Sequence, residues 1–199
     1  LAKEINGQAV ATEIARHELY GCTGAEMVQE MKPYFTDFPN VKNNCLRFEV
    51  SPSIEESSSF TDADWAELGN DFMQRMGLMN HQYIIIKHSG TESKKEQAHL
   101  HILANRISLS GELYRDNWIG KRATEAANAI AKERNFVQSQ DIGKANKEEI
   151  KEVMNSVLKK MQGFDLTKFQ EELGKLGFKV REARASTGKL NGYYVTARS

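Results

Sequence analysis

Two runs decide the fold: Tyr83-Ile-Ile-Ile-Lys-His88 and, after a polar segment, His99-Leu-His101-Ile-Leu-Ala-Asn105-Arg106. Both runs are dominated by aliphatic residues, while the segment between them is polar and contains Gly90. Two apolar runs around a polar loop predict a β-hairpin with a long connection. We expect the rest of the chain to pack around this hairpin.

Three of the five histidines in the chain lie on this predicted hairpin. Side chains alternate along a strand, so His99 and His101 leave the same face. Antiparallel pairing sets His88 roughly opposite His99, where cross-strand Cβ atoms lie about 5 Å apart. A lone strand histidine is usually an ordinary side chain, but three converging imidazoles are a ligand set for a divalent metal. Three neutral ligands leave the ion its double charge and open coordination positions, which suits a catalytic centre that holds an anion.

The same residues carry a resemblance to a known family. His88, then His99-Leu-His101-Ile102, then Asn105-Arg106 resembles the three-histidine signature of relaxases, the HUH-type DNA strand transferases that begin conjugative mobilisation. The likeness is closest to mobilisation-type (P-class) relaxases of mobile elements and extends over about 40–199. One departure is Gly90, where many family members carry an acidic residue, so the resemblance implies no carboxylate from this loop.

The resemblance implies an α+β fold, with an antiparallel HUH-relaxase sheet that carries the histidines and helices packed on it. It implies that His88, His99 and His101 hold one divalent ion, for which Mn, Mg, Zn, Ni and Co are all candidates. It further implies nicking of one DNA strand at an origin of transfer by a tyrosine, to mobilise a plasmid or mobile element. The implied partners are single-stranded origin-of-transfer DNA, accessory mobilisation proteins and a coupling protein.

Three further residues are candidates for the site. Glu49 lies on the polar face of a predicted strand and would accept a hydrogen bond from a ligand imidazole, fixing its tautomer. The alternative for Glu49 is an exposed ion pair with Arg47 or Lys87. Asn105 and Arg106 follow the histidines on the same strand and are candidates for DNA contacts, although an arginine at a strand end is more often a surface charge.

The nucleophile is the open question, because the relaxase tyrosine comes early, in a helix after the first strand. Here Leu1–Leu19 has apolar residues at helical spacing, and nothing before Tyr20 is expected to form a strand. Our hypothesis is therefore that the catalytic core lacks its native first strand and that the nucleophile lies upstream of Leu1. Tyr20 is the candidate within the chain. Tyr114 is the alternative if the chain is a Rep-type HUH endonuclease, which places its tyrosine after the histidines.

Two domains are expected. Residues 1–137 form the relaxase core, the polar stretch 138–144 marks a boundary, and 145–199 form an appendage of two helices and a hairpin. In the core, Trp118 is expected to anchor its helix in the apolar interior, with base stacking as the alternative.

The charged residues are distributed unevenly along the chain. The 199 residues carry no net charge, yet residues 1–80 have a net charge of −7 and residues 173–199 of +5. Residues 173–199 are therefore expected either to lie along nucleic-acid phosphates or to form a solvated basic tail. Two cysteines without a Cys-x-x-Cys pattern, and the lack of a signal peptide or membrane span, predict a cytoplasmic protein.

Besides the Rep-type alternative, a rival from another class is a non-catalytic single-stranded DNA-binding fragment. Such a fragment would bind DNA independently of metal and would form no covalent protein–DNA adduct. A metallohydrolase unrelated to DNA is least favoured, since the chain has no His-Glu-x-x-His motif.

Overall fold

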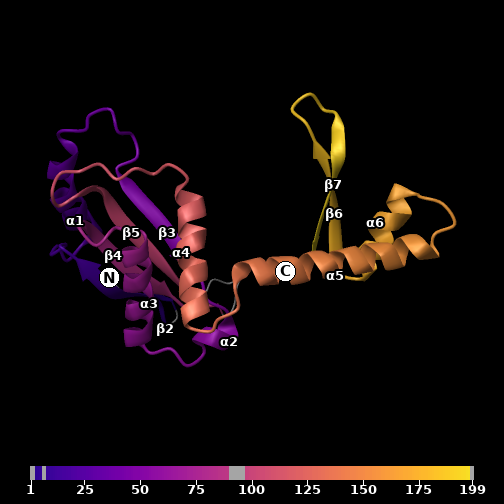
Figure 1. The fold of residues 1–199 in the computed structure, drawn as a ribbon, viewed down its shortest axis with the longest axis horizontal. Coiled ribbons are helices and arrows are strands. Elements are labelled where there is room, and N and C mark those ends of the chain that lie inside the picture. The colour runs from indigo at the N-terminus through magenta and orange to yellow at the C-terminus, as the bar shows by residue number, and fades with distance from the viewer. Residues whose placement is uncertain (1–2, 6–7, 90–96, 198–199) are drawn as a thin grey trace. The chain divides into compact units, whose positions relative to one another are not determined.

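The computed structural model describes residues 3–5, 8–89 and 97–197, in two compact units, Leu1–Val137 and Gln138–Ser199. The first unit is α+β, as the resemblance implied: helices pack on a five-stranded antiparallel sheet with the strand order β1-β2-β4-β5-β3 (Figure 1). Its strands are β1 (Lys3–Ile5), β2 (Gln8–His17), β3 (Cys45–Val50), β4 (His81–His88) and β5 (His99–Ser108). The predicted hairpin is confirmed as the β4–β5 pair, which lies inside the sheet between β2 and β3.

The expected helix over Leu1–Leu19 is wrong, because this segment forms β1 and β2. Strand β2 pairs with β4, with Ala11 opposite His88, so a strand fills the place beside His88 that was expected to be empty. The register shifts between Glu13 and Ala15, and this irregularity interrupts the two-residue alternation that would have marked a strand. Residues 8–17 form a strand because the edge of β4 supplies backbone hydrogen-bond partners, which an isolated segment does not have.

Helices cover both faces of the sheet. On one face lie α3 (Asp62–Arg75) and α4 (Ile119–Glu133), and on the other lies α1 (Gly24–Met31), followed by the 3-10 turn η1 (Lys32–Phe35). A short helix, α2 (Ile54–Ser57), follows β3. The N-caps Thr23 and Thr61 form capping boxes with Glu26 and Asp64, which satisfy backbone donors at each helix start.

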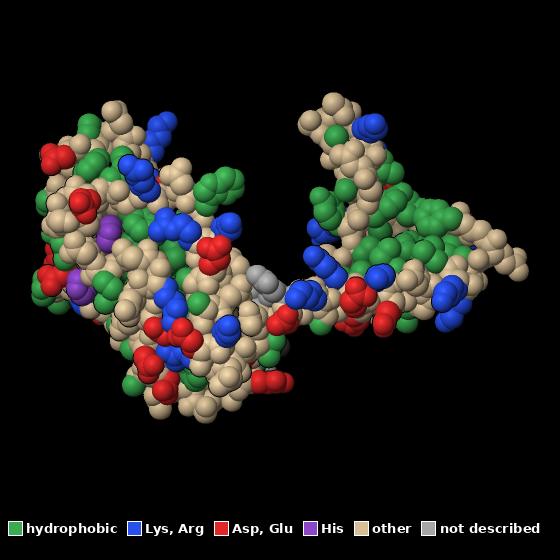
Figure 2. Space-filling view, viewed as in Figure 1, with side chains coloured by type: hydrophobic (Ala, Val, Ile, Leu, Met, Phe, Trp, Pro, Cys, Tyr) green, Lys and Arg blue, Asp and Glu red, His purple; other side chains and the backbone are tan. Residues whose placement is uncertain are grey.

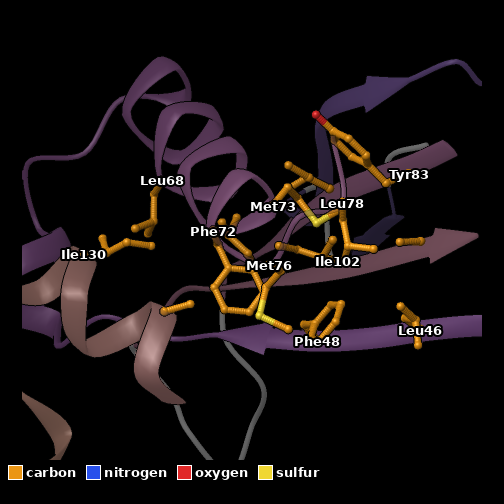
Figure 3. Packing of buried hydrophobic residues seen from close by; sticks show 14 of the residues in the cluster. Leu46, Phe48, Leu68, Phe72, Met73, Met76, Leu78, Tyr83, Ile102 and Ile130 are labelled. Carbon is orange, nitrogen blue, oxygen red and sulfur yellow. The ribbon is translucent and has the colours of Figure 1, made fainter. Parts of the chain in front are cut away.

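The main core lies between the sheet and α3. Alternate strand residues enter it, so Phe48 from β3 and Ile102 from β5 meet Phe72 and Met73 from α3 (Figure 3). The Phe48 and Phe72 rings pack edge to face with centroids 5.3 Å apart, a favoured arrangement for aromatic pairs. A smaller cluster of Leu19, Met27, Met31 and Ile84 occupies the opposite face.

Gly69 sets how closely α3 approaches the sheet. A Cβ at this position would lie 2.7 Å from Ile85 Cδ1 and 3.3 Å from Leu100 Cδ1. We expect Gly69→Val to lower the free energy of unfolding by about 2 kcal/mol, because the added methyl groups force the packed layers apart. Urea denaturation measures this. The matched control is Gly120→Val in α4, where a Cβ meets nothing within 4 Å; an equal loss in both variants would contradict the packing argument.

Trp118 is not the buried anchor that we expected. It is 81% exposed and precedes the first turn of α4 in the left-handed conformation, with φ of 55°. Trp118 is the N-cap residue, and α4 begins at Ile119. The helix packs on the main core through its buried residues Ala126 and Ile130.

The second unit contains α5 (Ser139–Lys160), α6 (Leu166–Lys175) and the antiparallel hairpin of β6 (Phe178–Arg184) and β7 (Leu190–Ala197). Its core is Val157, Phe169, Leu173 and Phe178. The polar stretch 138–144, expected to be a boundary, forms the N-cap and the first turns of α5, where exposed pairs such as Lys144–Asp141 support the helix. No helix in the described residues is long and apolar enough to cross a membrane.

Candidate metal centre

The β4–β5 pair brings three histidines together. His88 ends β4 directly opposite His99 at the start of β5, and His101 lies two residues further along the same face. One ring nitrogen from each histidine can serve as a ligand, and these three nitrogens lie within 4.8 Å of one another. The ring of His101 is 4.3 Å from that of His88 and 4.8 Å from that of His99, between centroids. His99 is buried and the other two are half-buried, and histidine side chains reach the surface of the first unit (Figure 2).

The ring nitrogens fit a divalent metal. His99 Nδ1 lies 3.3 Å from the Gln97 carbonyl oxygen, an acceptor, so the Nδ1 proton donates there and Nε2 keeps its lone pair. His99 Nε2 and His101 Nε2 are 3.2 Å apart. Two nitrogens each about 2.1 Å from one tetrahedral ion lie about 3.4 Å apart, so the spacing matches a shared ion. Burial, and then the charges of His88 and His99, lower the pKa of His101, which favours the neutral form that binds metal.

Glu49 lies beside this cluster. Strand β3 pairs with β5 so that Glu49 is the direct partner of His101, on the face that carries the histidines. The negative charge of Glu49 acts to raise the pKa of His101, against the effect of burial. His101 Nδ1 is buried and has no hydrogen-bond partner among the described residues, so it is a donor that a carboxylate would satisfy. Lys87, one of the two alternative partners expected for Glu49, binds Asp62 of α3.

Tyr20 is not brought to the histidines. It follows the end of β2 where His17 pairs with Tyr83, whereas Ala11 at the other end pairs with His88. Six residues of strand separate these ends, or about 20 Å. The Tyr20 side chain is 75% exposed and its hydroxyl donates to the Glu18 carboxylate at 3.0 Å.

Tyr114 and Tyr83 also lie away from the cluster. The Tyr114 backbone N–H donates to the Arg106 carbonyl, five residues from His101 and about 17 Å along β5. Its hydroxyl donates to the Met76 carbonyl at 2.7 Å, and burial raises its pKa. Tyr83 is buried in the main core, on the face that α3 covers. The structure therefore separates these two hydroxyls from the three histidines.

Asn105 and Arg106, the predicted DNA contacts, both form hydrogen bonds within the fold. Asn105 is fully buried; its amide donates to Gln82 Oε1 at 2.9 Å, and its side-chain oxygen accepts from the Ile107 N–H at 3.0 Å. The Arg106 guanidinium binds the Tyr114 carbonyl, the Asn43 carbonyl and the Asp116 carboxylate. Both side chains bind β5 to neighbouring segments, and their contact with DNA stays a prediction.

We expect Asn105→Ala to lower the free energy of unfolding by about 3 kcal/mol, because it leaves the Ile107 N–H and the Gln82 side-chain oxygen buried without partners. Urea denaturation measures the loss. Asn40→Ala, at an exposed turn position, should change stability by less than about 0.5 kcal/mol. A loss of single-stranded DNA affinity in the folded Asn105→Ala protein would support the DNA-contact prediction.

Sequence reasoning missed an apolar cavity of about 240 Å³ on the face that carries the histidines. Ile84 and Ile86 alternate with the core residues of β4, as His88 does, so they border the cavity and lead toward the cluster. The lining comes from the β2–α1 connection, α1, η1, the start of β3, β4 and β5: Leu19, Gly24, Met27, Val28, Met31, Phe35, Asn44, Cys45, Ile84, Ile86 and Leu103. These segments are far apart in the sequence, so no local pattern reveals the cavity.

An antiparallel sheet whose inner hairpin presents three histidines at one end defines an HUH-type nuclease domain. A family model described as "Relaxase: MobA/VirD2-like, nuclease domain" matches residues 3–136, and the chain belongs to this family. The match lies within the first unit. Searches of curated proteins and of solved structures found no significant match.

Proposed function

We propose that the first unit nicks one strand of DNA at an origin of transfer, by metal-dependent transesterification to a tyrosine, and so initiates mobilisation of a plasmid or mobile element. Family membership supports a DNA relaxase. The observation that carries the finer proposal is the convergence of His88, His99 and His101, with ring nitrogens within 4.8 Å, on a face that reaches solvent.

These three histidines would hold one divalent ion, chosen among Mn, Mg, Zn, Ni and Co by availability. When bound, the ion supplies positive charge to an oxygen of the scissile phosphate. The chain's own contribution is to orient the imidazoles. The Gln97 carbonyl accepts the Nδ1 proton of His99 and so fixes its tautomer. Glu49, the β3 partner of His101, would fix that of His101 by accepting its Nδ1 proton when the ion is bound.

In the proposed reaction, a tyrosine hydroxyl oxygen bonds to phosphorus and the bond from phosphorus to the 3′ oxygen breaks. The tyrosine proton is lost as the departing 3′ oxygen gains one, leaving a 5′-phosphotyrosine and a free 3′-hydroxyl. The phosphoester bond is conserved, so the reverse transfer reseals the strand without ATP. We keep the proposal that the attacking tyrosine is supplied ahead of Leu1, because Tyr20, Tyr83 and Tyr114 all lie away from the histidines.

Single-stranded rather than duplex DNA is the proposed substrate. The apolar cavity beside the histidines suits an unpaired base, whose faces are apolar, whereas bases within a duplex are already stacked. The accessory mobilisation and coupling proteins remain proposed partners. The Rep-type alternative needs a tyrosine downstream of the histidines, and the placement of Tyr114 does not favour it.

Covalent capture tests the proposal. The chain is incubated with Mn²⁺ and labelled single-stranded oligonucleotides that tile the DNA around its gene, and a denaturing gel then reveals any protein–DNA adduct. An adduct lost in both Tyr20→Phe and His99→Ala would make Tyr20 the nucleophile. Metal binding without an adduct supports a nucleophile ahead of Leu1, and a chain extended upstream should then form the adduct. DNA binding that ignores metal, with no adduct from either chain, would establish the non-catalytic alternative.

Glu49 has its own test. We expect Glu49→Gln to lower Mn²⁺ affinity 10- to 100-fold, roughly the effect of removing a carboxylate partner of a metal-binding histidine. Isothermal titration calorimetry measures the affinity. The control is Glu125→Gln, an exposed glutamate of α4 that pairs with Lys121. Unchanged affinity in Glu49→Gln would leave Glu49 as a surface charge.

A further inference from the structure

The β6–β7 hairpin of the second unit has one face in the core and one in solvent. Phe178, Val180 and Val195 pack against α5 and α6. The residues between them leave the opposite face: Lys179 pairs with Thr196, and Arg181 pairs with Tyr194. Lys179, Arg181 and Thr196 are exposed, and Tyr194 is 66% exposed. Two cations and a tyrosine therefore share the solvent face of a two-stranded sheet.

The two cations on this face are available to an anion. Among the described residues, neither Lys179 nor Arg181 forms an ion pair, whereas the neighbouring Arg184 binds Glu182. Lys179 and Arg181 are two residues apart on one strand, or about 7 Å, a spacing that suits successive phosphates of an extended strand. Lys189, near the hairpin turn, adds a further exposed positive charge. Exposed cations that form no ion pair with a described carboxylate complement a polyanion.

The surroundings of Tyr194 leave its ring accessible. Its neighbour toward the turn on the same face is Gly192, and across the strands from Gly192 lies Ala183. A Cβ built at Gly192 would meet no atom within 4 Å, so the space beside the ring is open. Arg181, directly opposite Tyr194, can lay its planar guanidinium against a stacked base. An aromatic ring beside a basic track is the arrangement that holds unpaired bases and their backbone.

We propose that the solvent face of β6–β7 is a second binding site for single-stranded DNA, separate from the histidine cluster and independent of metal. Lys179 and Arg181 contact phosphates, and an unpaired base stacks on Tyr194. The choice of DNA as the ligand rests on the proposed function of the first unit. The family match stops at residue 136, so it assigns no role to this face.

The test uses the whole chain in EDTA, with fluorescence anisotropy of a labelled 20-nucleotide oligo-dT at several salt concentrations. Lys179→Gln/Arg181→Gln should flatten the slope of log K against log salt by about 1.4, because two phosphate contacts are lost. The matched control, Lys144→Gln/Lys151→Gln, removes the same charge from α5 and should keep the slope. Equal slopes in the two variants would overturn the proposal.

Tyr194→Ala should weaken oligo-dT binding about tenfold, and Tyr194→Phe should retain it, because stacking needs the ring and not the hydroxyl. A 20-base-pair duplex should lose little affinity in Tyr194→Ala; an equal loss for duplex and single strand would overturn base stacking. His99→Ala should keep oligo-dT affinity in EDTA, and the hairpin variants should keep Mn²⁺ affinity. Oligo-dT affinity in EDTA therefore tests the hairpin face, and Mn²⁺ affinity tests the metal site independently.

Discussion

His99→Ala is expected to lower the affinity of the chain for Mn²⁺ at least about 100-fold. His99 is the most buried of the three histidines, with its Nδ1 facing the Gln97 carbonyl and its Nε2 3.2 Å from that of His101. Removing a group that only orients a ligand costs 10- to 100-fold in metal affinity, so removing the ligand itself should cost at least the upper end of that range. Isothermal titration calorimetry with Mn²⁺, then Zn²⁺ and Ni²⁺, measures the loss and the metal preference.

The matched control is His17→Asn, which removes a histidine outside the cluster, where the His17 ring stacks on Tyr83. Circular dichroism checks that both variants are folded. Unchanged Mn²⁺ affinity in folded His99→Ala would contradict a three-histidine site. A stoichiometry of one ion per chain in the parent protein, lost in His88→Ala and His101→Ala as well, would assign all three ligands.

Phe72→Ala is expected to lower the free energy of unfolding of the first unit by about 3–5 kcal/mol. Phe72 is 2% exposed and joins α3 to β3 through its edge-to-face contact with Phe48. The substitution loses the buried area of the ring and leaves a cavity between helix and sheet, because the surrounding strands are fixed by their hydrogen bonds. A domain of this size is stable by only about 5–15 kcal/mol, so the loss is a large share of the total.

Urea denaturation followed by fluorescence measures this effect. Trp118→Ala is the control, because it deletes a larger aromatic side chain that is 81% exposed in the same unit, and it should change stability by less than about 0.5 kcal/mol. Its unfolding is followed by far-UV circular dichroism, since it loses one of the two tryptophans. Similar losses in both variants would mean that burial in the α3 interface does not govern the stability of this unit.

The hairpin and the histidine cluster were predictable because their determinants are local. Alternation placed His99 and His101 on one face, and the pairing of two adjacent apolar runs fixed His88 opposite His99. The capping boxes at Thr23 and Thr61 were equally readable, since each involves only four consecutive residues. Glu49 was expected near the hairpin from its place on a polar strand face, but only the β3–β5 pairing made His101 its partner.

The errors share one cause, which is dependence on distant neighbours. The apolar residues of Leu1–Leu19 have helical spacing, yet residues 8–17 form a strand because they pair with β4. The hydrogen bonds of Asn105 to Gln82 and of Arg106 to Asp116 also depend on distant segments, so the sequence could not show them, and the predicted DNA contacts of the two residues stay untested. Sequence order also cannot show that Tyr20 lies at the opposite end of the sheet from His88.

By itself, the sequence determined the central hairpin, the three converging histidines and the relaxase class, because short-range alternation and the spacing of a few residues carry that information. Only the tertiary structure decided which strand lies beside β4, which polar side chains are consumed by internal hydrogen bonds, and that a cavity opens beside the histidines. Those features depend on free energies of pairing and burial between segments far apart in the chain, which no local pattern records.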